Sequence, residues 1–363
     1  MSLLVGACAF VQSAFGFAKY VDITTAWDGD DVANFPVLVK ITATKPAGFY
    51  TDVKHDGADL KFTDASGNGD YPYEIDTWAA NGDSYIWVKL PKLSSGMTFR
   101  MYYGDEDQTE PTNPTTDVWS GYDLVCHVSG NANDSATPDR AGALNPNGTT
   151  KTDGMVGKTH GNSEVDKGAA MINLIYPDRT SGVLPNGRFS YSFWFRPVVD
   201  IVAWKLLAGP SNGADTDAWS VRSYNPTTKL GIRTAKGSEV VAITDGFTVG
   251  TWYKIDVAMD GKALALYVDG ELKASSTSLN SSATRCWEPS MAWGGTADGE
   301  VVFGTSQSLA VDVDECRIFS TVADSVRIAA DYQTVANVAT FLSFSDPHGE
   351  EVVNVLPQGV IVK

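Results

Sequence analysis

Sulfur and histidine are scarce in this sequence. Its 363 residues include four cysteines and four histidines, and neither residue type shows the short spacing of a zinc or redox site. The cysteines are Cys8, Cys126, Cys286 and Cys316. Cys126 and Cys316 lie in apolar, strand-like runs, so we expect them either to be small buried side chains or to bridge one another.

Positive charge is also in short supply. Lys and Arg number 27 against 44 Asp and Glu, which gives a formal net charge of -17. No basic run is present, so we expect no nucleic-acid partner, because a phosphate-binding surface needs clustered Lys and Arg. The acidity suits an extracellular surface and cation sites, but it identifies no ligand.

Long apolar runs are missing after the start of the chain. Residues 1–18 are uncharged, apolar and rich in small residues, and they end at Gly16-Phe17-Ala18, which suits signal cleavage. We therefore expect a signal peptide over 1–18; a truncated leader, a first buried strand or a lipoprotein site at Cys8 are the alternatives. No later stretch reaches the roughly 18 apolar residues of a membrane span, so none is expected.

Glycine, aromatic residues and turn signals are plentiful instead. A content of 34 glycines and 11% aromatic residues fits an all-β chain better than a helical one. The acidic, proline-containing stretch 109–116 has the composition of a linker. We therefore predict one small antiparallel β-sandwich over 19–108, a larger one over 117–339, and a strand with a tail over 340–363.

Alternating apolar residues predict strands on both sides of the linker. In the first domain they cover Tyr20–Thr24, Phe35–Thr42, Leu60–Thr63, Tyr71–Trp78, Ser84–Leu90 and Met97–Tyr103. Within 84–90, Tyr85, Trp87 and Lys89 share one face, which we expect to point to solvent while the aliphatic face is buried. In the second domain, Asp-Gly turns at 260–261 and 269–270 join three antiparallel strands, and one short helix follows near the end.

The order of these features resembles two known domain families. The stretch from Gly187 to Val335 resembles a LamG-type concanavalin A-like jelly roll, through RFSYSFWFRP, GTWYKIDVAMDGKALALYVDGEL and VDVDECRIF. The segment before it resembles the bacterial domain of unknown function 2341 (DUF2341), through FPVLVKI, ADLKFTDASG, PYEIDTW, YIWVKLP and MYYGD. The resemblance implies a secreted, periplasmic or cell-surface bacterial protein, whose jelly roll binds a sugar, a glycan or a protein and sometimes holds calcium at a sheet edge.

The segment PYEIDTW also looks like the start of the active-site strand of laminarinase-type glycoside hydrolases. Glu74 and Asp76 share one face of a strand, about 6.5 to 7 Å apart, and a retaining glycosidase pairs its two carboxyls at about 5 to 5.5 Å. The hydrolase motif has a further Glu four or five residues after the first, where this chain has Trp78 and Ala79. We therefore interpret Glu74 and Asp76 as solvated strand residues and expect no catalytic residue.

Two further motifs are better explained as turns. Residues 209–213, GPSNG, match the spelling of a serine nucleophile elbow, but the only later histidine is His348. Residues 64–70, DASGNGD, place Asp64, Ser66 and Asn68 at the first positions of a calcium loop, yet Ile75 stands where the bidentate Glu belongs. We expect a plain hairpin turn there.

Candidate binding residues lie in the second domain. Asp134, Asp312 and Asp314 are hard oxygen donors that come together if the first and last strands of the jelly roll pair, as the resemblance implies, so they are the candidate calcium ligands. The alternative is that Asp312 and Asp314 cap a strand end and bond backbone amides. Trp219 with Arg222, and Trp287 with Arg285, combine an aromatic ring and polar neighbours, and they are the candidate sugar-binding residues.

The sequence thus predicts an exported, non-catalytic binding protein. Glycan recognition through the jelly roll is the leading hypothesis, and a protein-binding adhesin or structural surface module is the second. A divergent glycoside hydrolase is the enzyme alternative, and it requires two carboxyls that face each other across one cleft.

Overall fold

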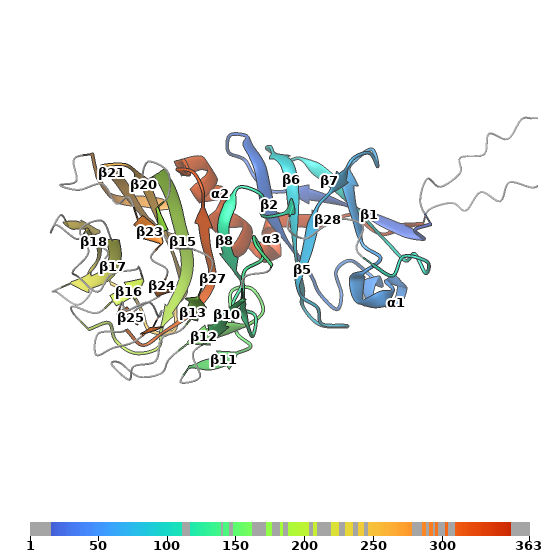
Figure 1. Cartoon of the computed structure of the whole chain (residues 1–363). Helices are drawn as coiled ribbons and strands as arrows, with labels where there is room; N and C mark the ends of the chain where they lie inside the picture. Colours follow the sequence, from blue (N-terminus) through green and yellow to red (C-terminus); the bar gives the residue numbers. More distant parts are fainter. Residues whose placement is uncertain are drawn as a thin grey trace, which may run out of the picture.

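Strands dominate the computed structural model of the chain, which confirms the all-β prediction (Figure 1). The structure describes residues 16–110, 117–138, 141–144, 148–161, 172–175, 182–183, 188–202, 206–208, 219–224, 229–234, 239–242, 246–277, 285–287, 290–292, 295–296, 302–303 and 309–349. In these ranges the α-helices are α1 (Phe49–Asp52), α2 (Ser325–Ala336) and α3 (Val338–Phe341). None of the helices there has the length and apolar character needed to cross a membrane.

The first module is a sandwich of two antiparallel sheets. One sheet has the order β28-β1-β7-β3-β4, with β29 also paired to β1, and the other has the order β2-β6-β5. The strands are β1 (Lys19–Thr25), β2 (Val32–Ile41), β3 (Lys61–Asp64), β4 (Asp70–Tyr71), β5 (Tyr73–Thr77), β6 (Ser84–Leu93), β7 (Thr98–Tyr103), β28 (Leu342–Phe344) and β29 (His348–Gly349). All six predicted strands are present, and Pro72 divides the predicted strand 71–78 because proline cannot donate to a ladder.

The C-terminal segment returns to this first module. Strand β28 pairs with β1, with Leu342 opposite Thr25 and Phe344 opposite Ile23, and β29 pairs with the start of β1. Phe341 and Leu342 lie in the core of the first module, as does Ala330 of α2. The segment predicted as a separate strand and tail therefore completes a sheet that begins more than 300 residues earlier in the chain.

The second module contains a long antiparallel sheet opposed by shorter ones. The long sheet has the order β11-β12-β27-β15-β20-β21-β22, with β8 also paired to β27, and the four-stranded sheets are β16-β17-β18-β19 and β24-β13-β10-β9. The strands of the long sheet are β8 (Tyr122–Cys126), β11 (Thr149–Lys151), β12 (Thr159–Gly161), β15 (Arg188–Pro197), β20 (Tyr253–Asp260), β21 (Ala263–Val268), β22 (Glu271–Ser276) and β27 (Val311–Phe319). The shorter sheets contain β9 (Ala132–Asn133), β10 (Ala141–Leu144), β13 (Ile172–Ile175), β16 (Leu206–Ala208), β17 (Trp219–Tyr224), β18 (Lys229–Thr234), β19 (Glu239–Ala242) and β24 (Ser290–Ala292), and two-stranded pairs join β14 (Gly182–Val183) to β23 (Arg285–Trp287) and β25 (Gly295–Thr296) to β26 (Val302–Phe303).

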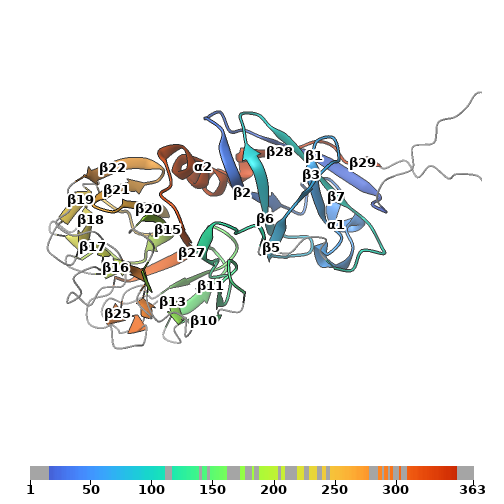
Figure 2. The ribbon, with the colours of Figure 1, turned by 45° about the horizontal axis from the view of Figure 1, so that its top comes forward.

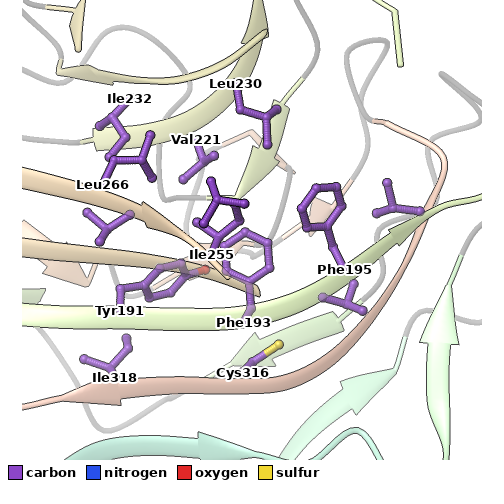
Figure 3. Packing of buried hydrophobic residues seen from close by; sticks show 14 of the residues in the cluster. Tyr191, Phe193, Phe195, Val221, Leu230, Ile232, Ile255, Leu266, Cys316 and Ile318 are labelled. Carbon is purple, nitrogen blue, oxygen red and sulfur yellow. The ribbon is translucent and has the colours of Figure 1, made fainter. Parts of the chain in front are cut away.

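The core of the second module lies between the long sheet and β17–β18. Tyr191, Phe193 and Phe195 of β15 point into it and meet Val221 of β17 and residues of β18 (Figure 3). All three aromatic side chains are buried, as their two-residue alternation predicts. Burial of this apolar surface is the main term that holds the two layers together.

Over β8, β15, β20 and β27, the outer face of the long sheet is covered by the first module and by α2, which lies between the two modules in Figures 1 and 2. Trp87 and Tyr85 of β6 and Leu38 of β2 pack there with residues of the second module. The prediction that Tyr85, Trp87 and Lys89 face solvent was therefore wrong, since Trp87 is fully buried and the other two are at most 9% exposed. Alternation separates the two faces of a strand, but it cannot show that a second module covers one of them.

Candidate functional site

His127 occupies the centre of the contact between the modules. It follows the end of β8, and its Nδ1 lies 2.8 Å from Oε1 of Glu315 on β27. Its Nε2 lies 3.3 Å from Oε2 of Glu74 on β5 of the first module. The imidazole and the Glu315 carboxylate are buried, so this ring joins two carboxylates across the junction in a medium that screens charge weakly.

The two carboxylates set the charge of the imidazole. Burial alone would lower the pKa of His127, but Glu315 and Glu74 outweigh it and raise the pKa well above the ordinary value. Burial alone would raise the pKa of Glu74, but the charge and hydrogen bonds of His127 lower it below the ordinary value. The pairing therefore favours the protonated form of His127 and the ionised form of Glu74.

The carboxylates of Glu74 and Asp76 are hydrogen-bonded to residues of the second module. Glu74 accepts hydrogen bonds from Trp119 and, at 2.7 Å, from Ser135, while Asp76 accepts one from Ser129 at 2.6 Å. Only 15% of the Glu74 side chain is exposed. The prediction of two solvated carboxylates was wrong, because the strand face that carries them is the face that docks on the second module.

A second charged cluster continues from Glu315 under α2. Arg317 of β27 donates to Oε2 of Glu315 at 2.5 Å and to Oδ1 of Asp331 in α2 at 2.9 Å. Its guanidinium stacks on Trp87 of the first module, 4.2 Å from the ring centroid. Lys254 of β20 completes the cluster through Asp256 and Asp331. Buried charges paired in this way are costly to break singly, because removal of one partner leaves the other buried without a counter-charge.

A β-bulge in β27 brings these charges to the junction. Val311 and Val313 point to the core at odd positions, but Cys316 and Ile318 do so at even positions. Glu315 has a positive φ of 50°, and the pairing of β27 with β15 shifts register there. The four charged residues 312, 314, 315 and 317 consequently share the outer face.

The sequence carried a signal for this bulge. In VDVDECRIF the apolar residues change from odd to even positions after Asp314, and an unbroken strand cannot change phase in that way. Glu315 and Arg317 could have been assigned to the outer face on that ground. Their partners Glu74 and Trp119 could not, because nothing in the sequence shows which surface covers this one.

The predicted calcium ligands have protein partners in the structure. Asp312 is paired with Lys151 at 2.6 Å and with Arg196 at 2.7 Å. Asp314 accepts the backbone amides of Val156 and Glu315, and Asp134 accepts those of Val125 and Ala136. The residues that the structure describes include no group of three His, Cys, Asp or Glu side chains that could hold a metal ion. These contacts agree with the backbone-bonding alternative for Asp314, and calcium binding stays a prediction.

The predicted sugar-binding residues lie on two different strands. Trp219 and Arg222 belong to β17, while Arg285 and Trp287 belong to β23, which pairs with β14 in a separate two-stranded sheet. The structure describes the backbone of these four positions, and their role stays a prediction. The GPSNG segment at 209–213 lies outside the described residues.

The remaining sequence motifs have structural roles. Cys126 and Cys316 are cross-strand partners in the core, and both are free thiols. Cys126 packs in the core whereas His127 lies at the junction, so the two adjacent side chains point apart. Asp64 accepts hydrogen bonds from Ser66 and Asn68 in the turn between β3 and β4, which confirms the predicted hairpin.

Comparison with known families assigns the two modules. Residues 56–123 match the family model of the Domain of unknown function (DUF2341). Residues 173–329 match the Concanavalin A-like lectin/glucanases superfamily. We call the first module the DUF2341 module and the second the concanavalin A-like module, after the family models that match part of each. Both predicted resemblances are thereby confirmed, and the structure adds β1, β2 and the C-terminal strands β28 and β29 to the DUF2341 module.

Solved structures that resemble part of the chain do so at low identity. The binding domain of Paraclostridial Mosquitocidal Protein 1 is 14% identical with a TM-score of 0.44, and the match covers 60% of this chain and 53% of that domain. The Botulinum Neurotoxin serotype G binding domain is 14% identical with a TM-score of 0.43, over 58% of this chain and 50% of the other. Domain 4 of AbnA, an extracellular arabinanase from Geobacillus stearothermophilus, is 18% identical with a TM-score of 0.41, over 58% and 97%.

The chain thus spans about half the length of the two toxin binding domains. A search of curated proteins found no significant match.

Proposed function

We propose that the chain is an exported carbohydrate-binding protein in which the concanavalin A-like module holds the ligand and the DUF2341 module is a fixed structural partner. One observation carries the non-catalytic part of this proposal. Glu74, the carboxylate that resembles a hydrolase residue, is bound by His127, Trp119 and Ser135 inside the junction. A glycosidase carboxyl has to face a sugar in a cleft, and this one faces the second module.

The junction also narrows the choice of ligand surface. The outer face of the long sheet is covered over β8, β15, β20 and β27, which favours a ligand surface on the opposing β16–β19 sheet. Val221 and Ser223 of β17 are buried on the core side. Trp219 and Arg222 are the two candidate residues on this strand. Of the two, we test Arg222 first, because its guanidinium can donate several hydrogen bonds to a sugar.

A glycan array and polysaccharide co-sedimentation with the full chain test this proposal. We expect binding that Arg222→Ala weakens by about tenfold, the effect of losing one charged contact of about 1.4 kcal/mol. Lys262→Ala is the matched control, because Lys262 is an exposed cation on the β20–β21 turn. Equal binding by both variants would exclude the β17 surface, and Trp287→Ala with Arg285→Ala would then test β23.

Two outcomes would favour the other function classes. Absence of binding to every glycan would favour the protein-binding adhesin. Release of reducing ends from a polysaccharide, abolished by Glu74→Gln, would show a hydrolase and overturn the proposal.

Calcium at the jelly-roll edge is a separate proposal. It rests on the oxygen donors Asp134, Asp312 and Asp314, and an ion at Asp312 would have to replace Lys151 or Arg196. Isothermal titration of the chelator-treated chain with CaCl2 tests it. We expect a heat of binding for the wild type and none for Asp312→Asn. The proposal is rejected if the wild type shows no heat of binding and CaCl2 does not shift its melting temperature.

A further inference from the structure

The buried cluster under α2 brings an amine and a carboxylate together in a condensing geometry. Nζ of Lys254 lies 2.8 Å from Oδ2 of Asp331 and 2.5 Å from Oδ1 of Asp256. Lys254 is 2%, Asp256 5% and Asp331 8% exposed. An ammonium carboxylate pair and an amide differ by one water molecule, and exclusion of bulk water favours the amide.

We propose that Lys254 and Asp331 form an intramolecular isopeptide bond, with Asp256 as the proton shuttle. The three residues supply every group that the reaction needs, and no oxidant or cofactor is consumed. This inference is independent of the carbohydrate ligand, since the cluster lies under α2 and away from β17 and β23.

The step balances with the groups present. Lys254 passes one proton to Asp256, and the free amine attacks Cγ of Asp331, so that a C–N bond forms. Asp256 and the new ammonium centre then each give one proton to Oδ2, which leaves as water when the C–Oδ2 bond breaks. Asp256 ends as the carboxylate it was at the start, and the net charge of the cluster is unchanged.

The surroundings support each part of this step. Arg317 donates to Oδ1 of Asp331 at 2.9 Å, where negative charge develops during the attack, as in an oxyanion hole. Burial raises the pKa of Asp256 to about 6, so this carboxyl accepts a proton more readily than an ordinary aspartate. The second oxygen of Asp256 has no hydrogen-bond partner among the described residues.

There is also room for the released water. Asp256, Arg317 and Asp331 line a cavity of about 30 Å³ beneath α2, together with Tyr122 and Tyr191. A water molecule needs a cavity of about 10 to 15 Å³ and two or more polar partners.

The charge of Lys254 opposes the reaction. Burial alone would lower the pKa of Lys254, but its pairing with two carboxylates outweighs burial and raises the pKa. This makes the first proton transfer uphill and the reaction slow compared with folding.

The bond would fix helix α2 to the long sheet permanently. Lys254 lies on β20 and Asp331 on α2, and α2 also packs on β2 of the DUF2341 module. The crosslink would therefore hold in place the helix that fills the junction between the two modules.

Intact mass spectrometry of the denatured full chain is the decisive experiment. The expected mass is lower than the calculated mass of the same chain by one water molecule, and a tryptic digest is expected to contain a branched peptide joining the segments of Lys254 and Asp331. Lys254→Arg, which keeps the positive charge, and Asp256→Asn, which removes the shuttle, are both expected to show the full mass. Folding of each variant is checked by circular dichroism before the mass is interpreted.

Asp331→Asn identifies the acceptor, because condensation with an amide releases ammonia and lowers the mass by one ammonia molecule instead. The proposal is overturned if the folded full chain has its full calculated mass. It is overturned equally if Lys254→Arg keeps the deficit of one water, which would instead place the loss in a succinimide at an Asp-Gly site.

Discussion

His127 shows at the scale of one residue how the junction depends on charge. Replacement by Gln keeps a polar side chain of similar size but leaves Glu74 and Glu315 without the cation between them. We expect His127→Gln to lower the free energy of unfolding by about 2 to 4 kcal/mol at pH 6, since breaking a buried ion pair has a cost of this size. Urea denaturation measures it, with His55→Gln on the exposed surface as the control.

The pH dependence of this loss follows from the sign of the shift. The pKa of His127 is raised in the folded state, so its stabilisation is complete below the ordinary value of 6.5 and is lost as the pH rises through the folded-state value. The difference between the wild type and His127→Gln is therefore expected to shrink in alkaline buffer. A difference that stays constant from pH 6 to 10 would show that the imidazolium charge is not involved.

The stability linked to Asp76 also falls as the pH rises, but here the charged form of the wild type is the unfavourable one. Burial raises its pKa to about 7, so the stability linked to its protonated form is present below 3.8 and is lost as the pH rises through about 7. Asp76→Asn retains an acceptor for Ser129 without the charge. We expect the variant to be more stable than the wild type by up to about 4 kcal/mol at pH 8 and to lose most of that advantage at pH 4. Thermal melts against pH test this, with the exposed Asp200→Asn as the control.

At the scale of elements, α3 and β28 join the end of the chain to its beginning. Phe341 is 2% exposed in the core of the DUF2341 module, whereas Phe344 only packs against its edge. We expect Phe341→Ala to destabilise the chain by about 3 to 5 kcal/mol and Phe344→Ala by less than half of that. Hydrogen exchange should show the loss at the amides of β1. Unchanged protection of β1 in Phe341→Ala would contradict the assignment of this segment to the first module.

The sequence predicts single strands and helices better than it predicts which of them lie side by side. The strands around Val37, Val88 and Phe193 were predictable because two-residue alternation is a local property, and so was the presence of a helix near the end of the second domain. The pairing of β28 with β1 was not, since it joins residues more than 300 positions apart. The same limit explains why Glu74 was assigned to solvent, because its partners His127 and Ser135 lie in the other module.

At the scale of the whole molecule, the two modules share one hydrophobic junction. A chain restricted to residues 16–110 would lack β28 and would expose Leu38, Tyr85 and Trp87. We expect this fragment to aggregate or to bind a hydrophobic dye, because large exposed apolar patches are unstable in water. The full chain is expected to unfold in one transition by calorimetry. Two separated transitions, or a soluble and well-folded fragment, would show that the modules are independent.

The pairing of β1 with β29 determines how the protein would respond to pulling. Lys19 lies opposite Gly349, so the described chain enters and leaves at the same place. Tension between these two points would peel β29 and then β28 from β1 one residue pair at a time, which is the weakest direction of loading for an antiparallel ladder. The concanavalin A-like module would lie outside the path of the force, and a ligand held there would stay bound while the terminal strands open.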